Sequence, residues 1–140
     1  MLLQSTLPLR FWSKVLADNS GCWLWTASLT GSGYAGYCVG HRARLVGHRV
    51  AYTDIVGPVP EGLTLDHLCR NRHCVNPAHL EPVTNKENIL RGYGSPAANA
   101  RKTHCKNGHL LPPPVRGKRD CKPCHRAYDV TYRRSGRRGR

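Results

Sequence analysis

The chain contains seven cysteines, at positions 22, 38, 69, 74, 105, 121 and 124. Because the number is odd and several lie close to histidines, the pattern fits metal binding better than a set of disulfides. The chain of 140 residues has one Phe, one Met and only 39% hydrophobic residues, so its core is thin. Chains with so little to bury usually depend on disulfides or metals for stability. We therefore expect a domain stapled by metal in a reducing, intracellular setting.

The first candidate metal site lies in the middle of the chain. Cys69, Cys74 and His79 fall within a short span that has little apolar content. A structural zinc ion takes four ligands in a tetrahedron, so the fourth must come from elsewhere. Cys22 and Cys38 are both available, and the spacing alone does not decide between them.

The second candidate zinc site is complete within about 20 residues, as a zinc finger or ribbon is. Its ligands are Cys105, His109, Cys121 and Cys124. His104 and His125 each neighbour a cysteine and could substitute for one of these ligands. Basic residues surround the site, as expected for a module that contacts nucleic acid; the candidates for that contact are Lys118, Arg119, Lys122 and Arg126.

Positive charge is concentrated in the last third of the chain. Residues 1–90 carry 8 Lys+Arg and 6 Asp+Glu, whereas residues 91–140 carry 14 and 2. Such a surplus is typical of a phosphate-binding arm, and we expect residues 131–140 to be disordered until they meet a polyanion. The start of the chain lacks the apolar core of a signal peptide, and no segment is long enough to span a membrane.

Periodicity and turn residues predict the order of elements. We expect an amphipathic helix over residues 9–17, then a hairpin of strands 22–26 and 33–40 with its tip at 30–32. A third strand over 41–47 and a helix over 48–56 follow, and then a strand over 63–68. Thr84 and Glu87 have the spacing of a capping box, which begins a helix that ends before Gly92.

Three residues around the first metal site have the chemistry of phosphodiester hydrolysis. Asp66 and Asn88 offer hard oxygen ligands for Mg²⁺ or Mn²⁺, which bind substrate phosphate. His67 follows Asp66 directly, and an imidazole can take a proton from water at neutral pH. The sequence therefore predicts one exchangeable catalytic cation beside a structural zinc ion.

The spacing of His67, Cys69, Cys74, His79 and Asn88, with GCWLWT and GHRVAY before it, resembles the His-Cys box branch of the HNH (His-Me finger) endonucleases. It is most similar to the small HNH enzymes of phages. The resemblance implies an α+β fold: a zinc-stapled ββα-metal core with an N-terminal β-hairpin and a C-terminal zinc-ribbon-like module. We divide the chain into a core (1–92), a linker (93–103), the module (104–128) and a basic tail (129–140).

The resemblance also implies roles for individual residues. His67 would be the general base, Asp66 and Asn88 would hold the catalytic cation, and Asn76 would brace the loop. Cys22 becomes the choice for the fourth zinc ligand. The partner would be double-stranded DNA, contacted in the core by Arg49, Arg70, Arg72, Lys86 and Arg91.

Two other functions compete with a DNA endonuclease. A zinc-stabilised DNA-binding protein without catalysis would explain the cysteines but gives no reason for Asp66, His67 and Asn88 at these positions. A ribosome-associated basic protein would explain only the charged tail. Whether the protein is a monomer or a dimer, which site it cuts, and whether it nicks or cuts both strands are left open by the sequence.

Overall fold

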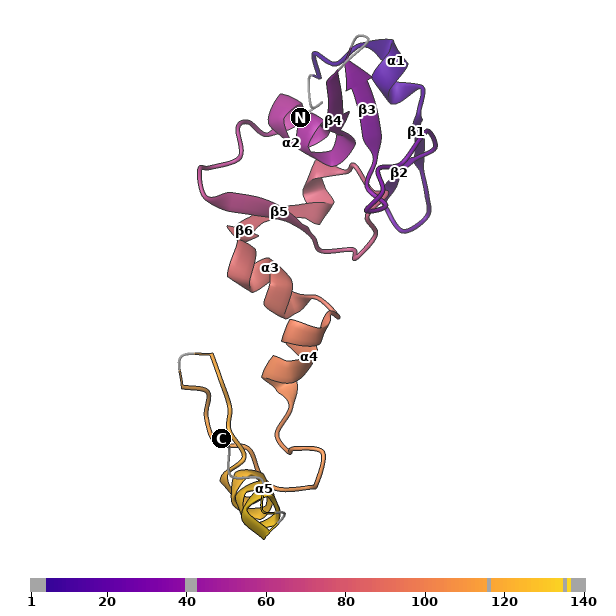
Figure 1. Cartoon of the computed structure of the whole chain (residues 1–140). Coiled ribbons are helices and arrows are strands. Elements are labelled where there is room, and N and C mark those ends of the chain that lie inside the picture. The colour runs from indigo at the N-terminus through magenta and orange to yellow at the C-terminus, as the bar shows by residue number, and fades with distance from the viewer. Residues whose placement is uncertain (1–4, 40–42, 116, 135, 137–140) are drawn as a thin grey trace. The chain divides into compact units, whose positions relative to one another are not determined.

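The computed structural model describes residues 5–39, 43–115, 117–134 and 136. The chain divides into two compact units, residues 1–91 and residues 92–140, which are described separately (Figure 1). Both are built from short helices and, in the first unit, two-stranded antiparallel sheets. Within the described residues, no helix is long and apolar enough to cross a membrane.

The first unit begins with a short helix and a hairpin rather than with one long helix. Helix α1 covers only Leu9–Trp12, and strand β1 (Val15–Ala17) pairs with β2 (Trp23–Trp25). The expected helix over 9–17 is therefore wrong in its second half. Of its expected apolar face, Trp12 and Val15 do pack against the core. Leu9 is 87% exposed, however, and Phe11, which lies outside that face, is fully buried. Four residues are enough to place Phe11 in the core.

The predicted hairpin of strands 22–26 and 33–40 is also wrong in its pairing. The turn at its expected tip does form, since the Thr30 N–H donates to the Tyr34 carbonyl at 2.8 Å. However, β2 pairs with β1, whereas β3 (Gly36–Val39) pairs with β4 (Ala43–Val46). Strand β4 is the expected third strand, and residues 41 and 42 of that prediction lie outside the described residues.

The core of the first unit is small and aromatic. The ring of Phe11 packs edge-on against that of Tyr37, with centroids 4.9 Å apart, and lies 5.1 Å from Trp25. Helix α2 (Gly47–Ile55) closes this cluster. A Cβ on Gly47 would lie 2.8 Å from that of Ala35, so the first turn of α2 approaches the core so closely that only glycine fits there.

The central stretch forms a hairpin followed by a helix. Strand β5 (Leu63–His67) pairs with β6 (Leu80–Thr84), a short 3-10 helix η1 (Pro77–His79) precedes β6, and α3 covers Asn85–Arg91. The capping box is confirmed: the Glu87 N–H donates to Thr84 Oγ1 at 3.2 Å, and the Thr84 N–H donates to the Glu87 carboxylate at 3.0 Å. The strand, the helix and its end before Gly92 follow the prediction; β6 had not been predicted.

The second unit contains α4 (Ser95–Arg101) and α5 (Lys122–Arg134). Residues 93–103, expected as a linker, thus include a helix. Residues 131–134, expected to be disordered, are the last turn of α5, where the Tyr128 and Tyr132 rings stack one turn apart. The remaining tail residues, 135 and 137–140, lie outside the described part of the chain.

Candidate metal centres and active site

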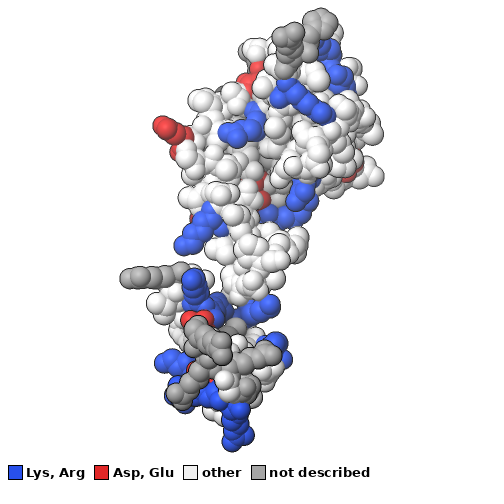
Figure 2. All heavy atoms as spheres, viewed as in Figure 1, with Lys and Arg blue, Asp and Glu red and all other residues white. Residues whose placement is uncertain are grey.

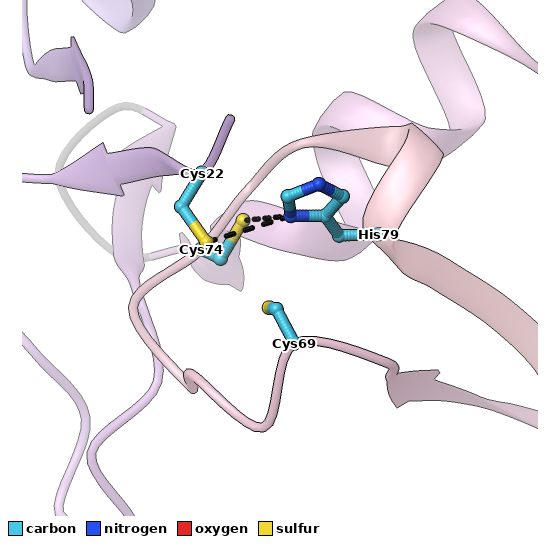
Figure 3. A group of neighbouring side chains, drawn as sticks. All are labelled: Cys22, Cys69, Cys74 and His79. Carbon is cyan, nitrogen blue, oxygen red and sulfur yellow. Dashed lines mark hydrogen bonds between the residues drawn. The ribbon is translucent and has the colours of Figure 1, made fainter. Parts of the chain in front are cut away.

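Four side chains meet where the hairpin of β1 and β2 approaches the loop after β5 (Figure 3). The donor atoms of Cys22, Cys69, Cys74 and His79 all lie within 4.8 Å of one another. His79 Nδ1 is 3.4 Å from the Cys22 sulfur and 3.7 Å from the Cys74 sulfur. Around a tetrahedral zinc ion, bonds of ~2.3 Å to sulfur and ~2.0 Å to nitrogen place such atoms about 3.6 Å apart. The donor set therefore fits a structural zinc ion.

The structure brings Cys22, and not Cys38, to this cluster. Cys22 is 4% exposed and directly precedes β2, whereas Cys38 lies in β3 with its side chain exposed. Asn76 holds Cys22's neighbour in place, because its Nδ2 donates to the Gly21 carbonyl at 2.7 Å. The Asn76 Oδ1 also accepts from the Ala78 N–H and so caps η1. Asn76 therefore connects the loop between Cys74 and His79 to Gly21, the residue before Cys22.

The environments of Cys69 and Cys74 disfavour their thiolates in the absence of a metal ion. Burial raises the pKa of Cys74 to about 12, and burial also raises the pKa of Cys69. A zinc ion binds thiolates and releases their protons on binding. Metal binding would therefore supply the charge that the buried site lacks.

The second cluster belongs to the C-terminal unit alone. The donor atoms of Cys105, His109, Cys121 and Cys124 also lie within 4.8 Å of one another. His109 Nδ1 is 3.3 Å from the Cys124 sulfur and 3.6 Å from each of the other two sulfurs. The neighbouring histidines, His104 and His125, are not part of the cluster.

The thiol of Cys105 contrasts with that of Cys74. Desolvation is the largest single effect and opposes its ionisation. Hydrogen bonds with the backbone at Asn107 and His109 and with the Cys124 and Cys121 side chains together lower the pKa of Cys105 to about 6. The Asn107 N–H donates to the Cys105 sulfur at 3.4 Å. Backbone donors of this kind are the usual support of a metal-bound thiolate, so this donor set also fits zinc.

His67 stands at the end of β5 with one ring nitrogen tied down. Its Nε2 lies 3.1 Å from the Cys74 carbonyl, and the side chain is buried. Because a carbonyl can only accept, Nε2 carries the proton and Nδ1 keeps its lone pair. Burial lowers the pKa of His67, although the Cys74 carbonyl and Asp66 oppose this. A neutral imidazole with Nδ1 unprotonated is the form that a general base needs.

Two neighbours of His67 were missed by the sequence analysis. The His48 ring lies 4.6 Å from that of His67 at a near-perpendicular angle, and the Tyr34 ring lies 5.8 Å from His67. His48 is 6% exposed, and its Nδ1 has no hydrogen-bond partner among the described residues. The only sequence signal was the His48-Arg49 pair, from which we had selected Arg49 alone.

Buried His48 makes the fold sensitive to acid. Burial, with help from His67 and Arg49, lowers the pKa of His48 from 6.5 to about 3. Between these two pKa values, His48 binds a proton in the unfolded chain but not in the folded chain. The stability of the fold with neutral His48 is therefore complete above pH 6.5 and decreases as the pH falls toward 3.

We expect wild type to lose about 2 kcal/mol more unfolding free energy than His48→Phe between about pH 7.5 and 5, from this shift alone. Urea unfolding at a series of pH values measures the difference, and both proteins share the acid sensitivity of the zinc ligands. If the unfolding free energies of the two proteins changed with pH in parallel, the prediction that His48 is buried in its neutral form would be wrong.

The Asp66 carboxylate lies between two guanidinium groups. Asp66 is 3% exposed, and its oxygens are 2.7 Å from Arg70 and 3.5 Å from Arg91. Arg91 also pairs with Glu81. Two of the arginines that we expected to contact DNA are thus ion-paired with Asp66 within the first unit.

Asn88 faces the same side of β5 as Asp66. Its Nδ2 donates to Thr64 Oγ1 at 3.2 Å, and Thr64 and Asp66 share one face of the strand because side chains alternate. This hydrogen bond uses the amide nitrogen, so Oδ1 is the atom that remains to accept. One carboxylate and one amide oxygen are suitable ligands for Mg²⁺ or Mn²⁺.

The other basic residues expected to contact DNA lie in varied environments. Arg49 and Lys86 are exposed, while Arg72 lies over the Tyr34 ring at 5.4 Å and donates to the Ser32 carbonyl. In the second unit, Arg119 donates to the carbonyls of Ala100 and Lys102, and Lys118, Lys122 and Arg126 are exposed. These DNA contacts stay predictions.

Comparison with known proteins supports the resemblance that the sequence suggested. Residues 47–90 match the family model described as HNH endonuclease, a range that includes His48, Asp66, His67 and Asn88. The range also contains three ligands of the first metal cluster, Cys69, Cys74 and His79. This segment is therefore similar in sequence to the HNH endonucleases. No solved structure matches the chain.

The chain is also similar to phage proteins. It is 31% identical over 64 residues to the "Uncharacterized gene 5.3 protein" of Enterobacteria phage T3, covering 42% of this chain and 63% of that protein. It is 34% identical over 76 residues to "Protein 2.8" of Escherichia phage T7, covering 54% and 51%. "Protein 7.7" of the same phage is 36% identical over 67 residues, covering 48% and 51%. The matches thus span about half to two thirds of these relatives.

Proposed function

We propose that this protein is a metal-dependent endonuclease that hydrolyses phosphodiester bonds of double-stranded DNA. In this proposal, β5, β6 and α3 form a ββα-metal core, and the protein is phage-encoded and acts on DNA inside the cell. The observation that carries the proposal is the state of His67, whose Nε2 is fixed by the Cys74 carbonyl at 3.1 Å. Nδ1 is thereby left as the basic atom, in the residue that follows Asp66 and within the segment that matches the HNH model.

The residues of the site divide the chemistry between them. His67 Nδ1 takes the proton of the attacking water, and the Cys74 carbonyl stabilises the imidazolium that forms by accepting from Nε2. Asp66 and Asn88 would hold Mg²⁺ or Mn²⁺, which when bound neutralises charge on the phosphate and the leaving oxygen. Arg70 and Arg91, which pair with Asp66, can turn to the phosphates once that carboxylate has another cation.

One observation favours the alternative, a zinc-stabilised DNA-binding protein without catalysis. Both oxygens of Asp66 already have arginine partners, so the carboxylate has a structural role without any added cation. The two functions differ in one measurable property, because only the nuclease converts supercoiled plasmid to nicked circles when Mg²⁺ is added.

We expect the zinc-loaded protein to nick supercoiled plasmid only when Mg²⁺ or Mn²⁺ is added. Asn88→Ala should slow nicking by at least about tenfold, since groups that support a metal site are worth that much or more. Ile89→Ala is the matched control, because Ile89 is the next residue of α3 and is 44% exposed. Agarose gels of plasmid over time give the rates. Equal rates for the two variants would remove Asn88 from the site, and a wild type that leaves plasmid intact would favour the alternative.

A further inference from the structure

The C-terminal unit has an open groove along α5. Cys124 of the second metal cluster lines it, but its other lining residues lie outside that cluster. The groove has a volume of about 450 Å³ and lies between the turn at Lys106 and Asn107 and one face of the helix. Tyr128 and Thr131 line the helix side. The rings of Tyr128 and Tyr132 stack one helical turn apart, with centroids 6.0 Å apart and planes inclined by 17°.

These tyrosines are not part of a hydrophobic core. Tyr128 is 64% exposed and Tyr132 is 44% exposed, and α5 has no buried residue. Among the described residues of this unit, only Ala97 and Cys121 are buried. Large aromatic rings held together on a surface mark a place where another molecule binds.

The charge around the groove restricts the kind of molecule that can bind. Residues 92–140, which form this unit, carry 13 Lys+Arg and only 2 Asp+Glu, and Figure 2 shows Lys and Arg side chains gathered on this unit with few acidic ones. Lys106 lines the groove itself, and Arg133 and Arg134 lie in the last turn of α5. The occupant must therefore carry negative charge and also present a flat apolar surface to Tyr128.

Unpaired nucleotides combine these two properties. Proteins that bind single strands use a positive groove for the backbone and aromatic side chains on which bases stack. A duplex satisfies only the first requirement, because its base faces are stacked on one another and only base edges reach the grooves. An apolar peptide satisfies only the second requirement, because it lacks the charge.

We infer that the groove along α5 binds unpaired nucleotides, with a base stacked on Tyr128 and the phosphates beside Lys106 and the arginines of α5. A DNA strand and an RNA strand share this chemistry. The inference goes beyond the proposed cleavage of duplex DNA and does not depend on it, because it involves none of the residues around His67.

Fluorescence anisotropy with the full-length, zinc-loaded protein tests the inference, without added Mg²⁺ so that nothing is cut. The probes are labelled oligothymidylate, oligouridylate and a hairpin duplex, with strands of about 20 nucleotides, longer than the ~4–16 nucleotides of common single-strand sites. Tyr128→Ala should weaken single-strand binding by about 5- to 150-fold, from ~1–3 kcal/mol of stacking per base, and leave duplex binding unchanged. Tyr128→Phe should bind as wild type does. The ratio between thymidylate and uridylate identifies the natural strand.

Tyr93→Ala is the matched control, since Tyr93 is a tyrosine of the same unit that is 83% exposed and does not line the groove. Zinc content and circular dichroism show whether each variant keeps its fold. If Tyr128→Ala loses zinc, a strand containing 2-aminopurine gives the answer with wild type, since stacking on tyrosine must change its fluorescence on binding.

Three results would overturn the inference. They are unchanged single-strand affinity in a folded Tyr128→Ala protein, an equal loss of duplex affinity, and a dimer of the wild type that Tyr128→Ala dissociates. The plasmid assay keeps this result separate from the proposed function. If wild type nicks but does not bind single strands, only the inference about the groove is overturned. If wild type binds single strands but never nicks, only the proposed nuclease activity is overturned.

Discussion

His67→Ala is expected to abolish nicking of supercoiled DNA while the protein keeps both zinc ions. His67 is in neither metal cluster, so its removal takes no ligand away. It does remove His67 Nδ1, the atom proposed to accept the proton of water, and a positioned general base contributes about 10²–10⁴-fold to the rate. The measurement is the initial rate of nicking with Mg²⁺, together with the zinc content of the same sample.

His73→Ala is the matched control, because His73 is an exposed histidine of the same loop. His67 packs against His48 and Tyr34, so alanine also leaves a cavity; His67→Gln fills most of it and should be as inactive as His67→Ala. Added imidazole should restore part of the rate of His67→Ala if a base is what has been lost. A folded His67→Ala protein that nicks as fast as His73→Ala would end the assignment of His67 as the general base.

The parts of the fold that the sequence predicted depend on neighbouring residues. The cap of α3 joins Thr84 to Glu87, three residues away, and Cys69, Cys74 and His79 lie in one loop. Such features are encoded in the spacing of residue types, so they can be found in a single sequence. The strand from Leu63 and the end of α3 before Gly92 were found in the same way.

The errors concern pairings between segments that lie apart in the sequence. Strand β2 has the same alternation whether it pairs with β1 or β3, because alternation shows which side of a strand is buried but not which strand is its neighbour. The choice of Cys22 over Cys38 depends on this pairing. His48 and Tyr34 were missed for the same reason, since they reach His67 only when α2 and the 28–36 turn pack against β5.

The end of α5 shows a limit of predicting disorder from composition. The composition of residues 131–140 predicted disorder, yet residues 131–134 are helical and Tyr132 stacks on Tyr128. Composition averages over a segment and does not register one contact at i,i+4 spacing. That single pair of rings also carries the inference about unpaired nucleotides, which composition alone did not suggest.

Cys22→Ser and Cys38→Ser are expected to behave differently although both remove one thiol from the first unit. Serine is close to cysteine in size but does not supply the thiolate that zinc prefers. If each of the two clusters binds one zinc ion, Cys22→Ser should therefore lower the zinc content from two ions per chain toward one. Cys38→Ser should keep both ions, because Cys38 is exposed and in neither cluster.

The loss of the first zinc ion should cost both stability and activity. Structural zinc contributes on the order of 10 kcal/mol in small peptides, and backbone hydrogen bonds such as Val75 N–H to the Trp23 carbonyl replace only part of this. Cys74 connects the metal cluster to His67. Its sulfur belongs to the cluster, and its carbonyl oxygen accepts the hydrogen bond from His67 Nε2. Loss of the zinc ion should therefore also loosen the loop that carries Cys74, so that His67 is no longer held in one orientation.

Three measurements on the same preparations of Cys22→Ser and Cys38→Ser test the connection between zinc binding, stability and activity. They are zinc content by atomic absorption, urea unfolding and plasmid nicking. We expect Cys22→Ser to be deficient in all three measurements and Cys38→Ser in none. If Cys22→Ser lost zinc but nicked at the wild-type rate, zinc binding to the loop with Cys69, Cys74 and His79 would not be needed to orient His67. The Cys74 carbonyl would then hold the base through the fold of the hairpin alone.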